Sequence, residues 1–441
     1  MPITELYALL MLASFFVLLL AGIPVGLTLA VSGFVWGWLG FGPILFNLLP
    51  HRIYGVVTNY TLLAIPLFVF MGVMLEKSRM AEELMDVVGR LAGNLRGGLG
   101  LGIVVVGVLM GASTGIVGAT VTTLGLLTLP NLLRRGYDPG LACGVICASG
   151  TLGQIIPPSL ILILLADILN LSVGTLFAAA MIPGLMLAAI YALYILALGV
   201  LRPGSMPPVP AAERALISTR ALWAKLAQVV APPFGLVVAV LGSIIGGVAA
   251  PTEAASMGAL GAILVTALGG RFGWRVLKET VQQTARITAM MMFILMCAQV
   301  FALSFRGLQG ERLVEDLFAF LPGGIGADIW FMMLIIFVLG FFIEWIEISY
   351  IAVPLFMPVL LKAEVDLVWI AALVCVNLQT SFLTPPFGWA LFFLRSVAPA
   401  EVRTGAMYRG VIPFILMQAL ALVLVYAFPG LATWLPRAIG W

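Results

Sequence analysis

The chain has 441 residues, of which 62% are hydrophobic and only 9% are charged, and its formal net charge is +3. Soluble domains carry about 25% charged residues, so this composition excludes a soluble protein, and no basic run indicates nucleic-acid binding. The many long apolar runs predict a polytopic all-α membrane protein embedded in a lipid bilayer. Runs such as "LYALLMLASFFVLLL" do not alternate, which excludes a β-barrel.

The first half of the chain, residues 1–201, begins without a cleavable signal, since "MPITE" lacks a basic region. Segment 76–96 is amphipathic and mixed in charge, which predicts a helix lying at the membrane interface, with a plain loop as the alternative. Two apolar stretches then break at membrane depth, "MGASTGIVGATVTTLG" (110–125) and "ASGTLGQIIPPS" (148–159). The second contains paired prolines, each of which removes a helix hydrogen bond and clashes with the preceding turn.

The most polar stretch, residues 202–229, follows and predicts a linker between two halves. Its excess of arginine and lysine places it in the cytoplasm. In the second half, residues 230–441, segment 306–321 predicts another interfacial helix. Two further breaks are expected at "GFFIEWIEISYIAVP" (340–354) and "NLQTSFLTPPFG" (377–388).

The breaks recur at a nearly constant spacing, which indicates an internal repeat. The pair Pro157 and Pro158 precedes the pair Pro385 and Pro386 by 228 residues. Basic residues fall in opposite loops of the two halves, as expected if each half crosses the membrane an odd number of times. The chain is therefore predicted to consist of two inverted-topology repeats, a plan typical of secondary transporters, with the N-terminus in the periplasm.

Broken helices at membrane depth predict a binding site, because they leave backbone carbonyls and amides unpaired. Hydroxyl and carbonyl oxygens without a carboxylate suit a monovalent hard cation such as Na⁺, whereas Ca²⁺ would require several carboxylates. The structural alternative is that glycine, serine and threonine only permit close helix packing. Packing does not account for proline pairs at matched positions in both halves.

Glu344 and Glu347 are charged residues within an apolar run. Their spacing of three predicts that both lie on one helix face. Carboxylates in such a run usually face a cavity or are protonated. We weigh three roles: lining the substrate path, carrying a coupling proton, or lying near a hairpin tip at the outer surface.

An enzyme is the rival from another class, and it would need a nucleophile with a base, or a metal cluster. His51 is the only histidine, and the cysteines Cys143, Cys147, Cys297 and Cys375 lie in apolar segments. Such cysteines are expected to pack as small hydrophobic residues. The sequence therefore predicts that the protein is not an enzyme; a passive channel is a further alternative.

Four ordered motifs resemble the large membrane subunit of tripartite ATP-independent periplasmic (TRAP) transporters, over about residues 20–415. They are "GASTG…LP", "RGYDPGLACGVICASGTLGQIIPPS", "GGVAAPTEAAS" and "NLQTSFLTPPFGWALF". The resemblance implies an inner-membrane secondary transporter with an elevator mechanism. In that mechanism a transport domain slides against a fixed scaffold. It also implies Na⁺ coupling, a small four-helix membrane subunit, and a soluble periplasmic binding protein that delivers a small organic anion.

The resemblance also locates the mobile elements. It implies re-entrant hairpins near residues 105–130 and 330–360, with the first tip at Gly111 to Gly115. It implies broken helices over residues 140–165 and 368–395. One departure stands out, because many members read something like "GMFMD" where this chain reads "GFFIEWIEIS".

Carried over by position, the tips and breaks supply the candidate site residues. The Na⁺ candidates are Ser113, Thr114, Gly150, Thr151, Asn377, Thr380, Thr384 and Pro385. The substrate-path candidates are Gly115, Gln154, Pro157, Pro158, Ser159, Glu344, Glu347, Gln379 and Pro386. The expected function is Na⁺-coupled, binding-protein-dependent uptake of a carboxylate such as a dicarboxylate, 2-oxo acid or sugar acid. A stand-alone anion/Na⁺ symporter of the same fold is the alternative.

Overall fold

The computed structural model describes residues 2–78, 80–91, 95–208 and 219–441. Within these residues the regular elements are helices, and no β-strand is present. Seven of the helices are long and apolar enough to cross a membrane, and a bent pair could form one more span. The prediction of an all-α polytopic membrane protein is therefore confirmed.

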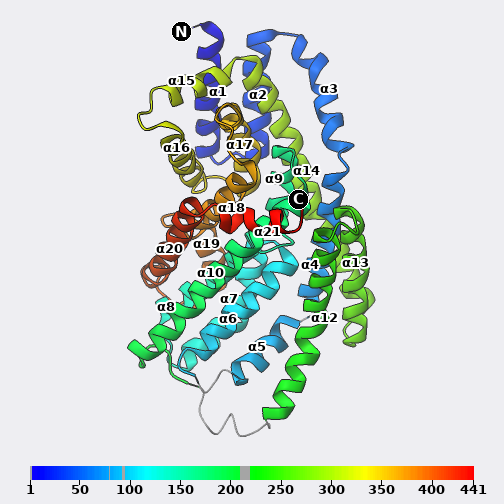
Figure 1. The fold of residues 1–441 in the computed structure, drawn as a ribbon, viewed down its shortest axis with the longest axis vertical. Helices are drawn as coiled ribbons and strands as arrows, with labels where there is room; N and C mark the ends of the chain where they lie inside the picture. The colour runs from blue at the N-terminus through cyan, green and yellow to red at the C-terminus, as the bar shows by residue number, and fades with distance from the viewer. Residues whose placement is uncertain (1, 79, 92–94, 209–218) are drawn as a thin grey trace.

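One set of helices, here called the scaffold group, comes from the beginning of each half and lies partly to the right in Figure 1. It consists of α1 (Ile3–Leu20), α2 (Val25–Phe41), α3 (Ile44–Val57), η1 (Thr61–Leu63), α4 (Ala64–Lys77), α12 (Thr219–Ile245), α13 (Pro251–Leu268) and α14 (Trp274–Gly307). Helix α14 packs along α2, and α13 packs along α4. Small residues permit this close approach: the Ser304 hydroxyl donates a 2.7 Å hydrogen bond to the Gly33 carbonyl.

The remaining elements, apart from the two amphipathic helices described below, form the hairpin group. Its members from the first half are α6 (Gly98–Thr114), α7 (Val117–Arg134), α8 (Pro139–Thr151), η3 (Leu152–Gln154), α9 (Leu160–Leu169) and α10 (Val173–Leu201). Those from the second half are α16 (Gly324–Leu339), α17 (Trp345–Lys362), α18 (Leu367–Leu383), α19 (Trp389–Val397), α20 (Thr404–Ala427) and α21 (Gly430–Ala438). Helices α6 with α7 and α16 with α17 are hairpins, and α8 with α9 and α18 with α19 are the two broken helices.

Both broken helices begin with an aspartate at the N-cap position. The Asp138 carboxylate accepts a hydrogen bond from the Leu141 amide at the start of α8, at 2.8 Å. The Asp366 carboxylate accepts one from the Val368 amide at the start of α18, at 3.0 Å. Aspartate is among the preferred N-cap residues because its oxygen satisfies an otherwise unpaired amide. The division into two inverted repeats stays a prediction, and the matched caps support it.

Two amphipathic helices lie where interfacial helices were expected. Helix α5 (Met80–Leu91) falls within segment 76–96, and α15 (Gly310–Ala319) falls within segment 306–321. They lie near opposite ends of the molecule (Figure 1). Residues 79, 92–94 and 209–218 lie outside the described residues, so part of the predicted linker is not described, and α12 already begins within that linker range.

Candidate functional site

The first broken helix is interrupted where the sequence indicates. Helix α8 ends at Thr151, a 3₁₀ turn runs to Gln154, and the peptide bond between Pro157 and Pro158 is cis. The chain from residue 150 to residue 160 is buried throughout. The Ser159 hydroxyl donates a 2.5 Å hydrogen bond to the Gln154 carbonyl. The Gln154 side chain is only 1% exposed, and within the described residues neither its amide nitrogen nor its oxygen has a hydrogen-bond partner.

The second broken helix has the same order of parts but is less enclosed. Helix α18 ends just before Thr384, whose backbone is extended, and the Pro385–Pro386 peptide bond is cis. Pro385 is half-buried and Pro386 is exposed. The Thr384 hydroxyl donates to the Thr380 carbonyl at 2.7 Å. Asn377 lies deeper, where its amide donates a 2.7 Å hydrogen bond to the Met333 carbonyl of α16.

The Thr151 hydroxyl joins the two broken helices. It donates to the Ala148 carbonyl at 2.9 Å within α8. It accepts from the Gln379 amide of α18 at 3.2 Å and lies 3.4 Å from the Gln418 amide of α20. The side-chain oxygens of both glutamines are buried and have no hydrogen-bond partner in the part of the chain that the structure describes. The structure thus brings the candidates Thr151 and Gln379 together and adds Gln418, which the sequence prediction missed.

The first hairpin tip lies against the first break. Helix α6 continues to Thr114, so Gly111 belongs to the helix and the turn is at Gly115 and Ile116, closer to the end of the predicted tip 111–115. Gly115 has a left-handed φ of 61°, which favours glycine. A Cβ atom on Gly111 would lie 2.6 Å from the Gly153 Cα atom, so the hairpin touches the break through two glycines. Ser113 and Thr114 form the last residues of α6, and their side chains lie outside the described part of the structure.

The second hairpin tip corrects one expectation about the two glutamates. Helix α17 begins at Trp345, and Glu344 precedes it with extended backbone at the N-cap position. Glu344 therefore caps the helix that contains Glu347 and is not itself part of it. Glu347 lies in the first turn of α17, where it is 3% exposed and, within the described residues, its Oε2 atom has no hydrogen-bond partner. Both glutamates thus lie near the hairpin tip, and Glu347 is buried within the protein there.

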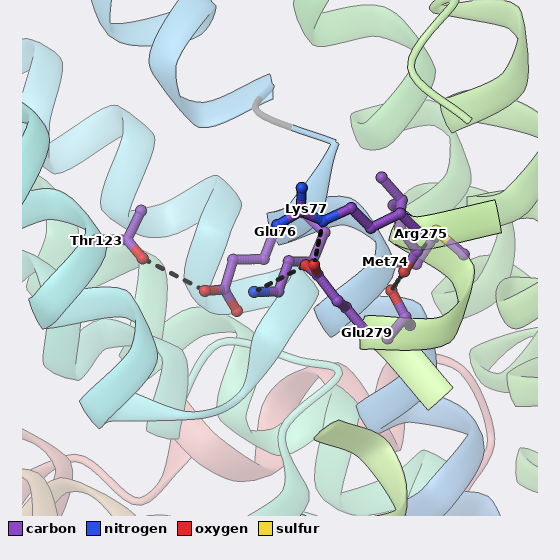
Figure 2. Close-up of polar contacts among 8 residues, drawn as sticks. Met74, Glu76, Lys77, Thr123, Arg275 and Glu279 are labelled. Atoms are coloured by element: carbon purple, nitrogen blue, oxygen red, sulfur yellow. Dashed lines mark hydrogen bonds and ion pairs between the residues drawn. The ribbon is translucent and has the colours of Figure 1, made fainter. Parts of the chain in front are cut away.

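A cavity of about 440 Å³ lies where both hairpin tips meet the scaffold group. The first tip contributes residues 116–119, the second contributes Glu344, and the end of α4 contributes Glu76 and Lys77. Thr123 of α7 also lines the cavity and donates a 3.4 Å hydrogen bond to Glu76, as Figure 2 shows. The cavity is of the size that ligand sites occupy.

The sequence prediction did not include Glu76, Lys77 or Gln283, which lines the same cavity from α14. The available signal was the abrupt change from an apolar run to charged residues at the end of α4. For Gln418 the signal was a single amide side chain within the apolar sequence "VIPFILMQALALVLVY". These signals do not show which helices face each other, so none of these residues could be placed in a site from the sequence.

A second polar contact links the scaffold group to the hairpin group. The Asn59 amide, between α3 and η1, donates a 2.5 Å hydrogen bond to the Asp167 carboxylate of α9. The Tyr350 hydroxyl of α17 donates to the same carboxylate at 2.9 Å. Asp167 is therefore a structural contact at the boundary between the two groups.

Among the described residues no group of three or more histidine, cysteine, aspartate or glutamate residues could hold a metal ion. All four cysteines are buried and free of disulfides. The oxygens gathered at the breaks are instead neutral hydroxyl, amide and carbonyl oxygens. Such neutral donors suit a monovalent cation better than a divalent one.

Comparison with known proteins identifies relatives along nearly the whole chain. Residues 12–431 match the family described as "Tripartite ATP-independent periplasmic transporter, DctM component". The C4-dicarboxylate TRAP transporter large permease protein DctM of Pseudomonas aeruginosa is 30% identical over 411 residues, covering 91% of this chain and 92% of that protein. The ectoine/5-hydroxyectoine TRAP transporter large permease protein UehC of Ruegeria pomeroyi is 28% identical, covering 95% and 96%.

A solved structure shares the fold. The YdaH transporter of Alcanivorax borkumensis, whose structure is described as having an unusual topology, matches with a TM-score of 0.62. The match covers 96% of this chain and 98% of that one at 16% sequence identity. At this identity the likeness shows the fold alone.

Proposed function

The chain belongs to the DctM component family of tripartite ATP-independent periplasmic transporters, and we propose that it carries a small carboxylate into the cell by Na⁺-coupled secondary transport. Its relatives are named transporter permeases rather than enzymes. Its helices and family place it in the inner membrane as a multi-pass protein. The single observation that carries the proposal is the meeting of both broken helices at one buried hydroxyl, that of Thr151.

Na⁺ would bind at the breaks, where the donor set fits it. Within the described residues, the side-chain oxygens of Gln154, Gln379 and Gln418 are buried without hydrogen-bond partners, and leaving such atoms unpaired is unfavourable. A cation bound at the breaks, where the candidates Gly150 and Thr151 lie, would satisfy oxygens of this kind. The bound ion supplies driving force, about 2.3 kcal/mol for each charge moved through 100 mV.

An elevator movement is the mechanism we favour for the transport step. The hairpin group contains both tips and both breaks, so it would carry the site as one body. Its polar side-chain contacts with the scaffold group include the Thr123–Glu76 and Asn59–Asp167 hydrogen bonds. A boundary with few polar contacts is suited to sliding. In this mechanism the hairpin tips bind and orient the substrate, and the closed hairpins exclude water from it.

The family is named for a tripartite system, so we propose two protein partners. One is a small four-helix membrane subunit, and the other is a soluble periplasmic binding protein that delivers the organic anion. A stand-alone anion/Na⁺ symporter of the same fold remains the second candidate.

Counterflow in proteoliposomes tests the function directly. The purified chain is reconstituted with its small subunit, and the binding protein is added loaded with radiolabelled carboxylate. We expect uptake that requires an inward Na⁺ gradient and the binding protein, and that stops when K⁺ replaces Na⁺. Uptake indifferent to Na⁺ would contradict the coupling, and full uptake without the binding protein would favour the stand-alone symporter.

A further inference from the structure

The cavity between the hairpin tips and the scaffold group carries more negative than positive charge. Its described lining includes two carboxylates, Glu76 and Glu344, and one cationic side chain, Lys77. The Lys77 ammonium is already shared, since it lies 4.0 Å from the Glu279 carboxylate. Glu279 also pairs with Arg275 at 2.9 Å, as Figure 2 shows. A dianionic ligand would therefore meet net repulsion in this cavity.

The Glu76 carboxylate is incompletely paired. Its Oε1 atom accepts one long hydrogen bond, 3.4 Å, from the Thr123 hydroxyl. Its Oε2 atom is buried and has no hydrogen-bond partner among the described residues. A buried carboxylate oxygen is normally satisfied by a donor or a positive charge. In this cavity the missing partner is a group that a ligand can supply.

The walls of the cavity suit a positively charged nitrogen beside these carboxylates. Three aromatic side chains line it, those of Trp345, Phe382 and Phe393. The faces of aromatic rings attract ammonium-type groups, most strongly where water is excluded. Carboxylate and aromatic surfaces together are the usual surroundings of a bound organic cation.

The same cavity also contains groups that favour a negatively charged part of a ligand. Helix α7 begins at Val117, and the residues of its first turn, 117–119, line the cavity. The first amides of a helix lack intrahelical partners and carry partial positive charge, so they favour a carboxylate. Thr122, one turn further along α7, lines the cavity as well.

We propose that this cavity binds an organic zwitterion, in which a carboxylate is joined to a cationic nitrogen. Glu76 and Glu344 face the nitrogen together with the aromatic wall, and the first turn of α7 faces the carboxylate. The inference rests on the proposed uptake of a carboxylate and narrows its substrate class from organic acids in general to amino-acid-like or betaine-like acids.

The test uses the purified complex of the chain with its small subunit in saturating Na⁺. Three probes are compared at equal ionic strength: ectoine and glycine betaine as zwitterions, and succinate as a dianion. The readout is the rise in Tm with probe concentration. We expect a saturable rise with at least one zwitterion, little rise with succinate, and a much smaller rise when K⁺ replaces Na⁺.

Variants assign the effect to the cavity. Glu76→Gln is expected to raise the apparent Kd for the zwitterion at least tenfold, and Glu344→Gln to raise it severalfold. Glu311→Gln is the matched control, since Glu311 of α15 pairs with Arg306 of α14 outside the cavity, and it should leave the Kd unchanged. If Glu76→Gln does not fold, Phe393→Leu keeps both carboxylates and should still weaken zwitterion binding.

Three results would overturn the zwitterion assignment. These are a rise in Tm with succinate alone, a rise with none of the probes, and zwitterion binding that Glu76→Gln and Phe393→Leu leave unchanged. Each of them leaves the proposed function open to its own test, because Na⁺-driven counterflow of a dicarboxylate would still support uptake of an organic acid.

Discussion

The Thr151 hydroxyl connects three helices that are far apart in the sequence. It bonds within α8, to Gln379 of α18, and lies within reach of Gln418 of α20. The sequence indicated Thr151 as an Na⁺ candidate and Gln379 as a substrate-path candidate, because both are polar residues close to a helix break. It could not predict Gln418, because the packing of α20 on α8 depends on the whole fold.

Removal of the Thr151 hydroxyl should weaken both stability and the Na⁺ response. Thr151→Ala leaves the Gln379 and Gln418 amides without this acceptor, at about 1–3 kcal/mol for each buried donor left unpaired. We expect a lower Tm of the purified chain and a higher Na⁺ concentration for half-maximal uptake.

Thr151→Ser is the control, since it keeps the hydroxyl. It should restore the Na⁺ response even if the lost methyl group lowers the Tm slightly. An unchanged Na⁺ response in Thr151→Ala would show that this hydroxyl is not part of the ion site.

At the scale of single elements, the two helical hairpins show where sequence patterns succeed and fail. Glycine and proline indicated both broken helices, because these residues interrupt helices by local chemistry, whereas the two hairpins were expected from the family resemblance. The ends of the helices were harder to predict from the sequence: α6 runs on to Thr114, and α17 does not start until Trp345. A helix end at a tip is decided by what the tip touches, such as the contact of Gly111 with Gly153.

That contact predicts the effect of one added methyl group. Gly111→Ala would place its Cβ atom 2.6 Å from backbone atoms of Gly153, so α6 must shift away from the break. Overpacking of this kind costs about 1–3 kcal/mol. We expect a lower Tm and at least a tenfold loss of uptake, measured by thermal unfolding and counterflow.

Gly242→Ala is the matched control within α12, because its Cβ atom would meet nothing within 4 Å. Alanine is the better helix former by about 1 kcal/mol, so this variant should unfold at the same or a higher temperature and transport normally. Equal uptake by both variants would show that the hairpin does not need its close contact with the break.

For the whole molecule, composition alone was enough to predict a polytopic helical protein. The repeated proline pairs and the alternating basic loops predict a division into two inverted repeats, which stays a prediction. They could not predict how the scaffold group and the hairpin group meet. That boundary depends on contacts such as Asn59 with Asp167, in which neither residue has a distinctive sequence context.

If the hairpin group slides against the scaffold group, a bridge between the groups must stop transport. We predict that Asn59→Cys with Asp167→Cys, bridged by Hg²⁺, abolishes counterflow and that excess thiol restores it. The native cysteines are all buried, which limits competing reactions. Each single variant treated with Hg²⁺ serves as a control and should keep its activity. A bridged double variant with undiminished uptake would exclude a sliding movement at this boundary.

Thr151 and Gln379 are 228 residues apart, the same interval that separates Asp138 from Asp366 and one proline pair from the other. If the two halves are inverted repeats, as the sequence predicts, these residues are counterparts that contact each other. In a two-fold arrangement, a residue that contacts its own counterpart lies beside the symmetry axis. The predicted axis would then pass beside this hydrogen bond. Both residues belong to the hairpin group, so if that group moves as one body, this buried contact travels with it and persists throughout the movement.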